Sequence, residues 1–261
     1  MRTLLLKHVL PIVLLTYLGL GAVLFLFQKS FIYYPDERAF EDCTLLPRES
    51  QITVGPSTRA YFGTPPATTS DILIVYHGNA GNACDRAFLV TNLAEPLGMA
   101  WLLVEYTGYA QDGKRPHRDA LLENAREVTT WLEAQNVDRE FVYGASLGSA
   151  VASYHASLRA PDVLIAVSPF PTLTSVARSA YPIYPGVLLR EHYDAAVWAS
   201  TTPRALIIAA ADDSLIPPAL SRAYFDALTT QDKQFTLIEN ANHNDLFAEP
   251  QFYTTIREFL E

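Results

Sequence analysis

The chain has 261 residues, a formal net charge of −9 at pH 7 and a hydrophobic content of 49%, against 18% charged residues. This balance is typical of a folded protein rather than a disordered one, and the length is enough for one substantial hydrophobic core. The negative charge argues against a nucleic-acid partner, because binding to phosphates depends on clustered Lys and Arg side chains, which this sequence lacks.

The N-terminal segment contains nineteen consecutive residues without a charge, from Val9 to Phe27. A helix of this length, rising about 1.5 Å per residue, crosses nearly the whole hydrocarbon core of a bilayer, which is about 30 Å thick. The alternative is a cleaved signal peptide, whose apolar region is shorter and ends in a small-residue cleavage site. The run here is longer and has no such site. Residues 1–30 are therefore predicted to be an uncleaved membrane anchor.

The charges around this segment indicate its orientation. Arg2 and Lys7 precede the apolar run, whereas Lys29 alone follows it closely, next to Asp36 and Glu37. Positive charge is enriched on the cytoplasmic side of membrane spans, so the N-terminus is expected there. The sequence thus predicts a single-pass membrane protein whose main domain lies on the non-cytoplasmic side.

The two cysteines, Cys43 and Cys84, do not form a C-x-x-C pair, which excludes a zinc ribbon and a thioredoxin-like site. Unpaired cysteine behaves as a small hydrophobe, so two buried free thiols are the favoured interpretation. The alternative is a disulfide, which would require an oxidising compartment.

Residues 31–261 are predicted to form one domain in which apolar runs of strand length alternate with helical patterns. Most of the runs are almost continuously hydrophobic, as expected for parallel strands covered on both faces. The alternation predicts an α/β fold with a mostly parallel central sheet and helices on both faces. The predicted strands are Gln51–Val54, Arg59–Phe62, Ile72–Tyr76, Trp101–Glu105, Phe141–Tyr143, Val163–Val167, Ala205–Ala209 and Phe235–Ile238, and the clearest helices are His117–Gln135, Leu147–Leu158, Pro218–Thr229 and Asn244–Leu260.

Residues 170–203 interrupt this alternation, because they are rich in proline and tyrosine and contain no strand run. In an α/β sheet, such an insertion would lie above the carboxyl ends of the strands, where ligands bind. It is either a small cap over a pocket or an ordinary irregular helix pair, and the sequence favours neither.

The most informative motif is G-A-S-L-G at residues 144–148. It follows the strand run Phe141–Tyr143 and opens a helix rich in small residues. A G-x-S-x-G motif in this context forms a tight turn that leaves the serine exposed at the end of the strand. Ser146 is therefore predicted to be a nucleophile.

A serine hydroxyl is a poor nucleophile unless a base removes its proton and a third group orients that base. His243 follows the last predicted strand and is the predicted base. Two candidate acids, Asp212 and Asp213, follow the strand Ala205–Ala209, and only one of them can face the imidazole. The remaining histidines lie before the anchor, in the loop after Tyr76, at helical positions or in the insertion: His8, His77, His117, His155 and His192.

Acyl transfer also needs hydrogen-bond donors for the carbonyl oxygen that becomes negative in the transition state. Removing one such donor typically raises the activation free energy by about 2.7–4 kcal/mol. The backbone N–H of Leu147 is one predicted donor. The second is the N–H of Asn79, in the H-G-N-A-G-N loop that follows the strand run Ile72–Tyr76. His77 and Gly78 are predicted to support this loop. Its glycines could instead bind phosphate, but no G-K-[ST] sequence follows, which argues against a P-loop.

Together these motifs resemble the membrane-anchored α/β-hydrolase-domain family, whose members carry one N-terminal span and a minimal lid. The likeness covers nearly the whole chain. In that family the acid lies in a G-x-x-D-x-x-V/I-P pattern, and counting back four residues from Pro217 gives Asp213 rather than Asp212. The shared motifs are Gln28–Pro35, Tyr76–Asn82, Val104–Tyr109, Gly144–Gly148, Ser168–Phe170, Ile216–Pro217 and His243–Asp245.

Two positions depart from the family pattern: Ala210 replaces the glycine of the acid motif, and Ala110 replaces the last glycine of a G-Y-G. The resemblance implies the α/β-hydrolase fold and hydrolysis of esters, thioesters or amides, with no metal or organic cofactor. It leaves the substrate and the oligomeric state open.

The predicted function is serine hydrolysis through an acyl-enzyme by Ser146, Asp213 and His243. The anchor favours a small-molecule, lipid or acylated substrate near a membrane. A serine peptidase of the same mechanism and a catalytically inactive, membrane-tethered binding protein are the alternatives.

Overall fold

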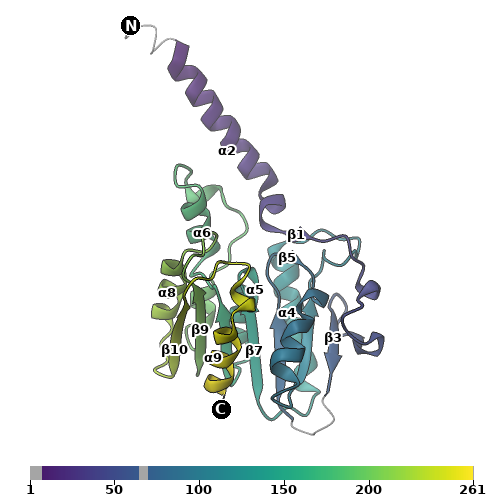
Figure 1. Cartoon of the computed structure of the whole chain (residues 1–261). Helices are drawn as coiled ribbons and strands as arrows, with labels where there is room; N and C mark the ends of the chain where they lie inside the picture. The colour runs from purple at the N-terminus through teal and green to yellow at the C-terminus, as the bar shows by residue number, and fades with distance from the viewer. Residues whose placement is uncertain (1–7, 65–69, 261) are drawn as a thin grey trace.

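The computed structural model describes residues 8–64 and 70–260. An eight-stranded sheet lies between two layers of helices, and one long helix projects away from this domain (Figure 1). The strand order is β10-β9-β8-β7-β4-β6-β3-β2. All neighbouring strands are parallel except at the β2 edge, where β3 pairs antiparallel with both of its neighbours. The predicted α/β fold with a mostly parallel sheet is confirmed.

The predicted strands are all present, with ends that differ by at most two residues. A further two-stranded ladder, formed by β1 (Tyr34–Pro35) and β5 (Ala80–Gly81), joins the segment after the long helix to the loop after β4. The strands of the main sheet are β2 (Gln51–Thr53), β3 (Arg59–Gly63), β4 (Ile72–Tyr76), β6 (Ala100–Glu105), β7 (Glu140–Ala145), β8 (Val163–Val167), β9 (Ala205–Ala210) and β10 (Lys233–Ile238).

Apart from helix ends that shift by one or two residues, the predicted helices differ from the structure at two places. The last helix begins at Pro250 and not at Asn244, because the residues before it form a turn around His243 and a short 3-10 helix. Residues 84–94 are helical but were not predicted, since they divide among 3-10, α and π turns and follow no single period. The α-helices are α2 (Leu10–Ile32), α3 (Ala87–Leu89), α4 (Arg118–Glu133), α5 (Leu147–Leu158), α6 (Leu173–Ala180), α7 (Ala195–Ala199), α8 (Pro218–Ala227) and α9 (Pro250–Leu260), and the shorter turns are η2 (Phe40–Asp42), η3 (Arg48–Ser50), η4 (Cys84–Arg86), η5 (Val90–Ala94), η6 (Gly186–Leu188) and η7 (Leu246–Ala248).

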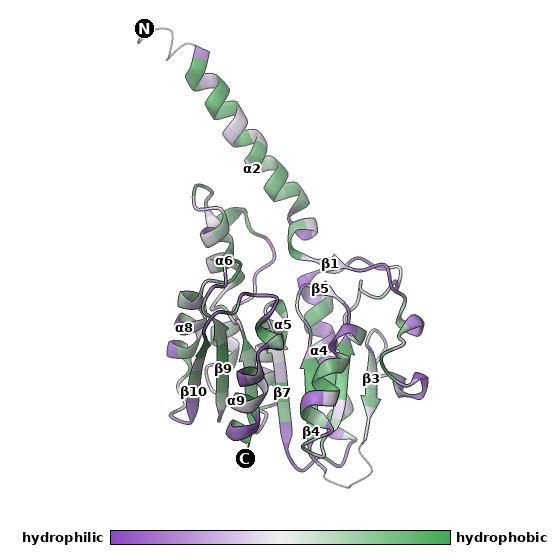
Figure 2. Cartoon of the chain, in the orientation of Figure 1, coloured by the Kyte–Doolittle hydropathy of each residue, from purple (hydrophilic) through white to green (hydrophobic). Residues whose placement is uncertain are grey.

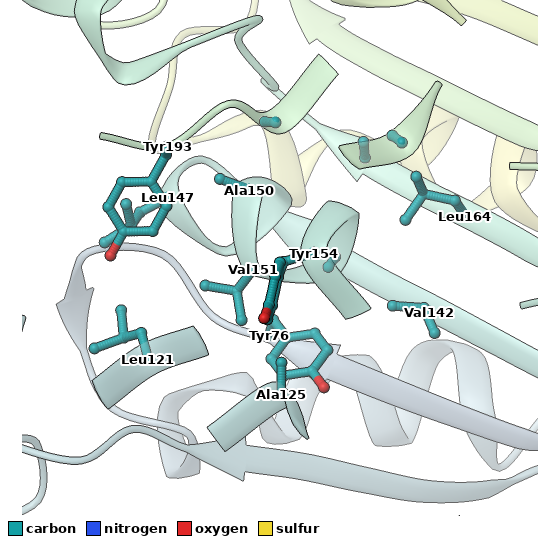
Figure 3. Packing of buried hydrophobic residues seen from close by; sticks show 14 of the residues in the cluster. Tyr76, Leu121, Ala125, Val142, Leu147, Ala150, Val151, Tyr154, Leu164 and Tyr193 are labelled. Atoms are coloured by element: carbon teal, nitrogen blue, oxygen red, sulfur yellow. The ribbon is translucent and has the colours of Figure 1, made fainter. Parts of the chain in front are cut away.

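Two hydrophobic cores cover the two faces of the sheet, and the central strands contribute alternate residues to each. Ile74 of β4 belongs to the core under α4, α5 and α7, whereas its neighbour Val75 belongs to the core under α3 and α9. Successive side chains of a strand point to opposite faces, so a strand buried on both faces must be apolar throughout. Figure 3 shows the first core, with Val151 of α5 close to Tyr76 of β4.

Within the part of the chain that the structure describes, α2 is the one helix long and apolar enough to cross a membrane. Its 23 residues correspond to about 34 Å of helix. Apolar residues cover most of its length (Figure 2), and most of its side chains are exposed.

Cys43 and Cys84 form a disulfide, so the interpretation as two free thiols is wrong. Both residues are buried in the core under α3 and α9. The bond joins the segment that follows β1 to the start of η4. It therefore fastens the segment that leads away from α2 to the loop that follows β4.

Replacing both cysteines by serine is predicted to lower the free energy of unfolding by about 2–4 kcal/mol, because the disulfide closes a loop of about forty residues and restricts the unfolded chain. Denaturant unfolding of the Cys43→Ser/Cys84→Ser protein against wild type measures this loss. Before reduction, a thiol-alkylating reagent should add no mass to the denatured wild type. Addition of two alkyl groups without reductant would contradict the disulfide.

Candidate active site

Ser146 occupies a strained turn between β7 and α5. Its φ of 53° and ψ of −121° lie outside the conformations that residues other than glycine ordinarily adopt. Its N–H donates a 2.8 Å hydrogen bond to Val167 O, at the end of β8. A Cβ at Gly144 would clash with Gly148 O, and a Cβ at Gly148 would clash with Tyr76 O. Two glycines therefore allow α5 to start close against the central strands with Ser146 at its tip.

The acid and the base lie at the ends of two further strands. Asp213 follows β9, and its Oδ2 lies 2.7 Å from Nδ1 of His243, which follows β10. The other carboxylate oxygen accepts the N–H groups of Leu215 and Ile216 at 3.0 and 2.7 Å. A fourth donor is the hydroxyl of Ser168, 3.0 Å from Oδ2.

Burial alone would raise the pKa of Asp213. The hydrogen bonds from His243 and from the N–H of Ile216 outweigh burial and hold the pKa of this carboxyl below its ordinary value. Asp213 is therefore ionised at neutral pH and can only accept a hydrogen bond. It fixes the proton of a neutral His243 on Nδ1, which leaves Nε2 free to take up a second proton.

The described residues include no hydrogen bond between the side chains of Ser146 and His243. In substrate-free enzymes, hydrogen bonds between catalytic groups are often long and tighten when the substrate binds. The structure thus brings the predicted acid and base into direct contact and places the predicted nucleophile at the end of β7, along the same carboxyl edge of the sheet.

The loop after β4 lies against the turn at Ser146. A Cβ at Gly78 would be 3.5 Å from Ala145 O and 3.7 Å from Ser146 Cβ. The next residue, Asn79, lines the same cavity as Ser146 and as Leu147, the first residue of α5. The two predicted oxyanion donors therefore belong to segments on either side of the predicted nucleophile.

His77 lies behind this loop and is buried. Its ring packs on Tyr106 at a centroid distance of 4.1 Å, and its Nδ1 lies 2.8 Å from Gly78 O. Its Nε2 lies 3.3 Å from Glu105 Oε1 without a well-aligned hydrogen bond. These contacts fix the ring to the loop backbone and keep it away from the cavity beside Ser146.

The other candidates lie apart from this group. Asp212 is exposed, and its N–H donates a hydrogen bond to Ala241 O. His155 is buried between Tyr76 and Glu140. His117 accepts a hydrogen bond from the N–H of Ala120 at the start of α4.

Two residues of the site had no role in the sequence prediction. Ser168 donates to Asp213, and Asp245 accepts the N–H of Asn242, which holds the turn that carries His243. Both belong to motifs that the sequence shares with the family. A motif alone, however, does not show which atom a hydroxyl or carboxylate contacts.

The two departures from the family pattern have simple local consequences. Ala110 adopts a φ of 45°, a conformation that favours glycine, and is buried. Its carbonyl accepts hydrogen bonds from Phe40 N–H and the guanidinium of Arg59. Ala210 is the last residue of β9, and its methyl group is buried in the core under α3 and α9.

A cavity of about 350 Å³ opens beside Ser146. Its walls come from the loop after β4 together with the start of α5, from one side of α2 and Tyr34, from Phe170, from Leu215 and Ile216 in the loop after β9, and from a segment that we call the cap arm, residues 173–190. The lining residues from the cap arm are mostly apolar: Leu173, Val176, Ala177, Arg178, Ala180, Tyr181, Tyr184, Pro185, Gly186, Leu188 and Leu189. Residues 195–199, also within the predicted insertion, form α7, which packs into the core next to α5.

No family model matches the sequence. The uncharacterized protein Rv2307c of Mycobacterium tuberculosis is 32% identical over 267 aligned positions, which cover 96% of this chain and 94% of that protein. Protein bem46 of Schizosaccharomyces pombe is 23% identical over 199 positions, 72% of this chain and 66% of bem46.

Solved structures share the fold at low sequence identity. The monoacylglycerol lipase of Paleococcus ferrophilus superposes with a TM-score of 0.60 at 17% identity, covering 77% of this chain and 98% of the lipase. An esterase of Pyrococcus furiosus gives a TM-score of 0.63 at 15% identity, covering 88% and 97%. The chain has the α/β-hydrolase fold. It belongs to the same family as the mycobacterial protein, with which it shares nearly its full length.

If Asp213 orients the base of this α/β-hydrolase, Asp213→Asn should lower kcat for p-nitrophenyl butyrate by about 10³- to 10⁴-fold, because the amide favours the wrong imidazole tautomer. Asp212→Asn is the matched control and should keep kcat, since its side chain is exposed. Equal or reversed losses in the two variants would contradict Asp213 as the acid.

Proposed function

We propose that this protein is a serine hydrolase that cleaves carboxylic ester, thioester or related acyl bonds through an acyl-enzyme. The observation that supports this most strongly is the strained serine at the start of α5, together with an ionised Asp213 bonded to His243 at the same edge of the sheet. A strained backbone at a functional position and a carboxylate–imidazole pair are what an activated serine requires.

In the acylation step, Oγ of Ser146 attacks the carbonyl carbon of the substrate while Nε2 of His243 takes the hydroxyl proton. The electron pair of the C=O bond moves onto oxygen, and the N–H groups of Asn79 and Leu147 bind this oxyanion. Ionised Asp213 stabilises the imidazolium. Collapse of the intermediate breaks the bond to the alcohol or thiol, which leaves with the proton from His243.

Deacylation repeats these steps with water as the nucleophile. His243 takes a proton from the water, whose oxygen attacks the acyl carbon. The second tetrahedral intermediate expels Oγ of Ser146, which recovers its proton from His243. The products are a carboxylic acid and the regenerated enzyme, and one water molecule is consumed for each bond cleaved.

We also propose that α2 is an uncleaved, single-pass anchor and that residues 31–261 form the catalytic domain on the non-cytoplasmic side. The length and apolar character of α2 support the first part. The disulfide between Cys43 and Cys84 supports the second, because disulfides persist in oxidising compartments. An active site next to a bilayer favours lipid-like or acylated substrates.

A fluorophosphonate probe should label the wild type and should not label Ser146→Ala, because the probe reacts with an activated serine hydroxyl. Ser214→Ala is the matched control: this serine is exposed in the loop that carries Asp213, and its loss should leave labelling unchanged. In-gel fluorescence over a time course measures the rates. If the wild type reacts no faster than Ser146→Ala, the protein is not a serine hydrolase, and a catalytically inactive binding protein becomes the better description.

A further inference from the structure

The cavity beside Ser146 extends along the anchor helix. Leu24, Gln28 and Phe31 line it at helical spacing, on one side of α2, with Ile32 at the lower end. These residues span about 12 Å of helix. The opposite wall is the cap arm, so the cavity is a groove between the helix and the arm, closed at its base by Ser146.

Two polar residues of this groove, Ser146 and Asn79, lie at its base. The walls are mainly aliphatic and aromatic side chains, with Gln28 and Arg178 among them. A ligand with a reactive carbonyl at one end and a long apolar chain at the other matches this distribution. The groove therefore fits the acyl chain of a lipid ester or an acylated molecule better than a peptide, whose backbone polar groups would stay unpaired there.

The cap arm is bonded to α2 well above the site. The rings of Tyr17 and Tyr184 stack at a centroid distance of 4.7 Å. The Tyr17 hydroxyl donates to Ile183 O and the Tyr184 hydroxyl to Tyr17 O, both at 3.0 Å. Lower down, the side-chain oxygen of Gln28 accepts the N–H of Arg190 at 2.7 Å. The arm thus follows α2 from Gln28 to Tyr17, over about 16 Å of helix.

The stacking of Tyr184 on Tyr17 determines how far the cap arm must reach into the bilayer if α2 crosses a membrane. In the described part of α2, only Leu10–Thr16 extends beyond Tyr17, which is about 10 Å of helix, a third of the roughly 30 Å hydrocarbon core. That part is too short to span a bilayer. The helix can cross only if Tyr17, and the arm tip stacked on it, also lie within the hydrocarbon.

The composition of the arm tip agrees with this depth. Residues 181–189 carry no charge, and Ile183 and Val187 are 69% and 82% exposed. Large apolar side chains gathered at an exposed tip are unfavourable in water and favourable in lipid. The charged residues that flank this tip are Arg178 and Arg190 on the arm and Lys29 on α2, whose long cationic side chains can reach the headgroups.

We propose that the cap arm and the adjoining part of α2 lie together in the leaflet on the catalytic side, and that lipid substrates enter the groove between them directly from that leaflet. The acyl chain then stays in an apolar environment while its carbonyl reaches Ser146 at the level of the headgroups. This inference rests on the proposed acyl hydrolysis. It makes the anchor helix a wall of the substrate-binding site as well as a tether.

The groove is tested on the full-length protein in phosphatidylcholine vesicles with two probes, p-nitrophenyl palmitate and p-nitrophenyl butyrate. Leu24→Trp places a larger ring in the groove and should lower kcat/KM for palmitate by about tenfold or more, with a change below about twofold for butyrate. Leu26→Trp is the matched control two residues away: its side chain is 64% exposed and does not line the groove. It should leave the palmitate-to-butyrate ratio at the wild-type value.

An unchanged ratio in Leu24→Trp would overturn the groove, while butyrate hydrolysis that still requires Ser146 would leave the proposed function standing. If the wild type hydrolyses neither ester, the proposed function itself fails.

The depth of the arm is tested without any activity. Val187→Trp adds a tryptophan at the arm tip, and Leu158→Trp adds one at the exposed end of α5, at the far edge of the domain. In vesicles with brominated acyl chains, the fluorescence added by Val187→Trp should be strongly quenched and that added by Leu158→Trp should not. Equal quenching of the two would place the arm outside the hydrocarbon and overturn the proposal.

Discussion

The close approach of α5 to the central strands is the constraint on which the site depends. At Gly144 and Gly148 there is no room for a side chain, because the start of α5 presses against β7 and against the carbonyl of Tyr76 at the end of β4. Next to this contact Ser146 adopts its strained, positive-φ conformation, and the tip of α5 lies against the loop after β4. Since parallel strands end at one edge of the sheet, the loops after β4, β7, β8, β9 and β10 meet there.

The same edge also receives the end of the anchor helix. The side-chain amide of Asn79 donates to Ile32 O, the last residue of α2, and Asn79 O accepts the N–H of Tyr34 and the hydroxyl of Tyr109. Next to them, the Tyr33 hydroxyl donates to Glu191 at 2.6 Å. Residues 32–34, where the chain leaves α2, are therefore hydrogen-bonded to the predicted oxyanion loop and to Glu191, which directly follows the cap arm. A shift of the helix relative to the domain would disturb both walls of the cavity.

The sequence predicts those features that depend on local pattern. Apolar strands, the G-x-S-x-G turn and a histidine after the last strand are each visible within a few residues. The choice of Asp213 over its neighbour came from the family pattern alone, because nothing local distinguishes two adjacent carboxylates. In the structure, Asp213 points inward and accepts four hydrogen bonds, whereas Asp212 is exposed.

Features that depend on long-range placement could not be predicted. The disulfide needs the segment after α2 to fold back onto η4, and two cysteines forty-one positions apart carry no signal for that. The contact between α2 and the cap arm is hidden for another reason. Residues 9–27 are uncharged on every side of the helix, so the pattern of the sequence does not show which side of α2 lines the cavity.

The most direct test of Ser146 as the nucleophile is capture of the acyl-enzyme itself. The full-length protein is mixed rapidly with p-nitrophenyl butyrate, quenched in acid within one turnover and digested, and the peptides are mapped by mass spectrometry. We predict a butyryl group on Ser146, formed together with a burst of p-nitrophenol close to one equivalent per enzyme. Turnover with the acyl group on another residue, or with no acylated peptide at all, would contradict a covalent mechanism at Ser146.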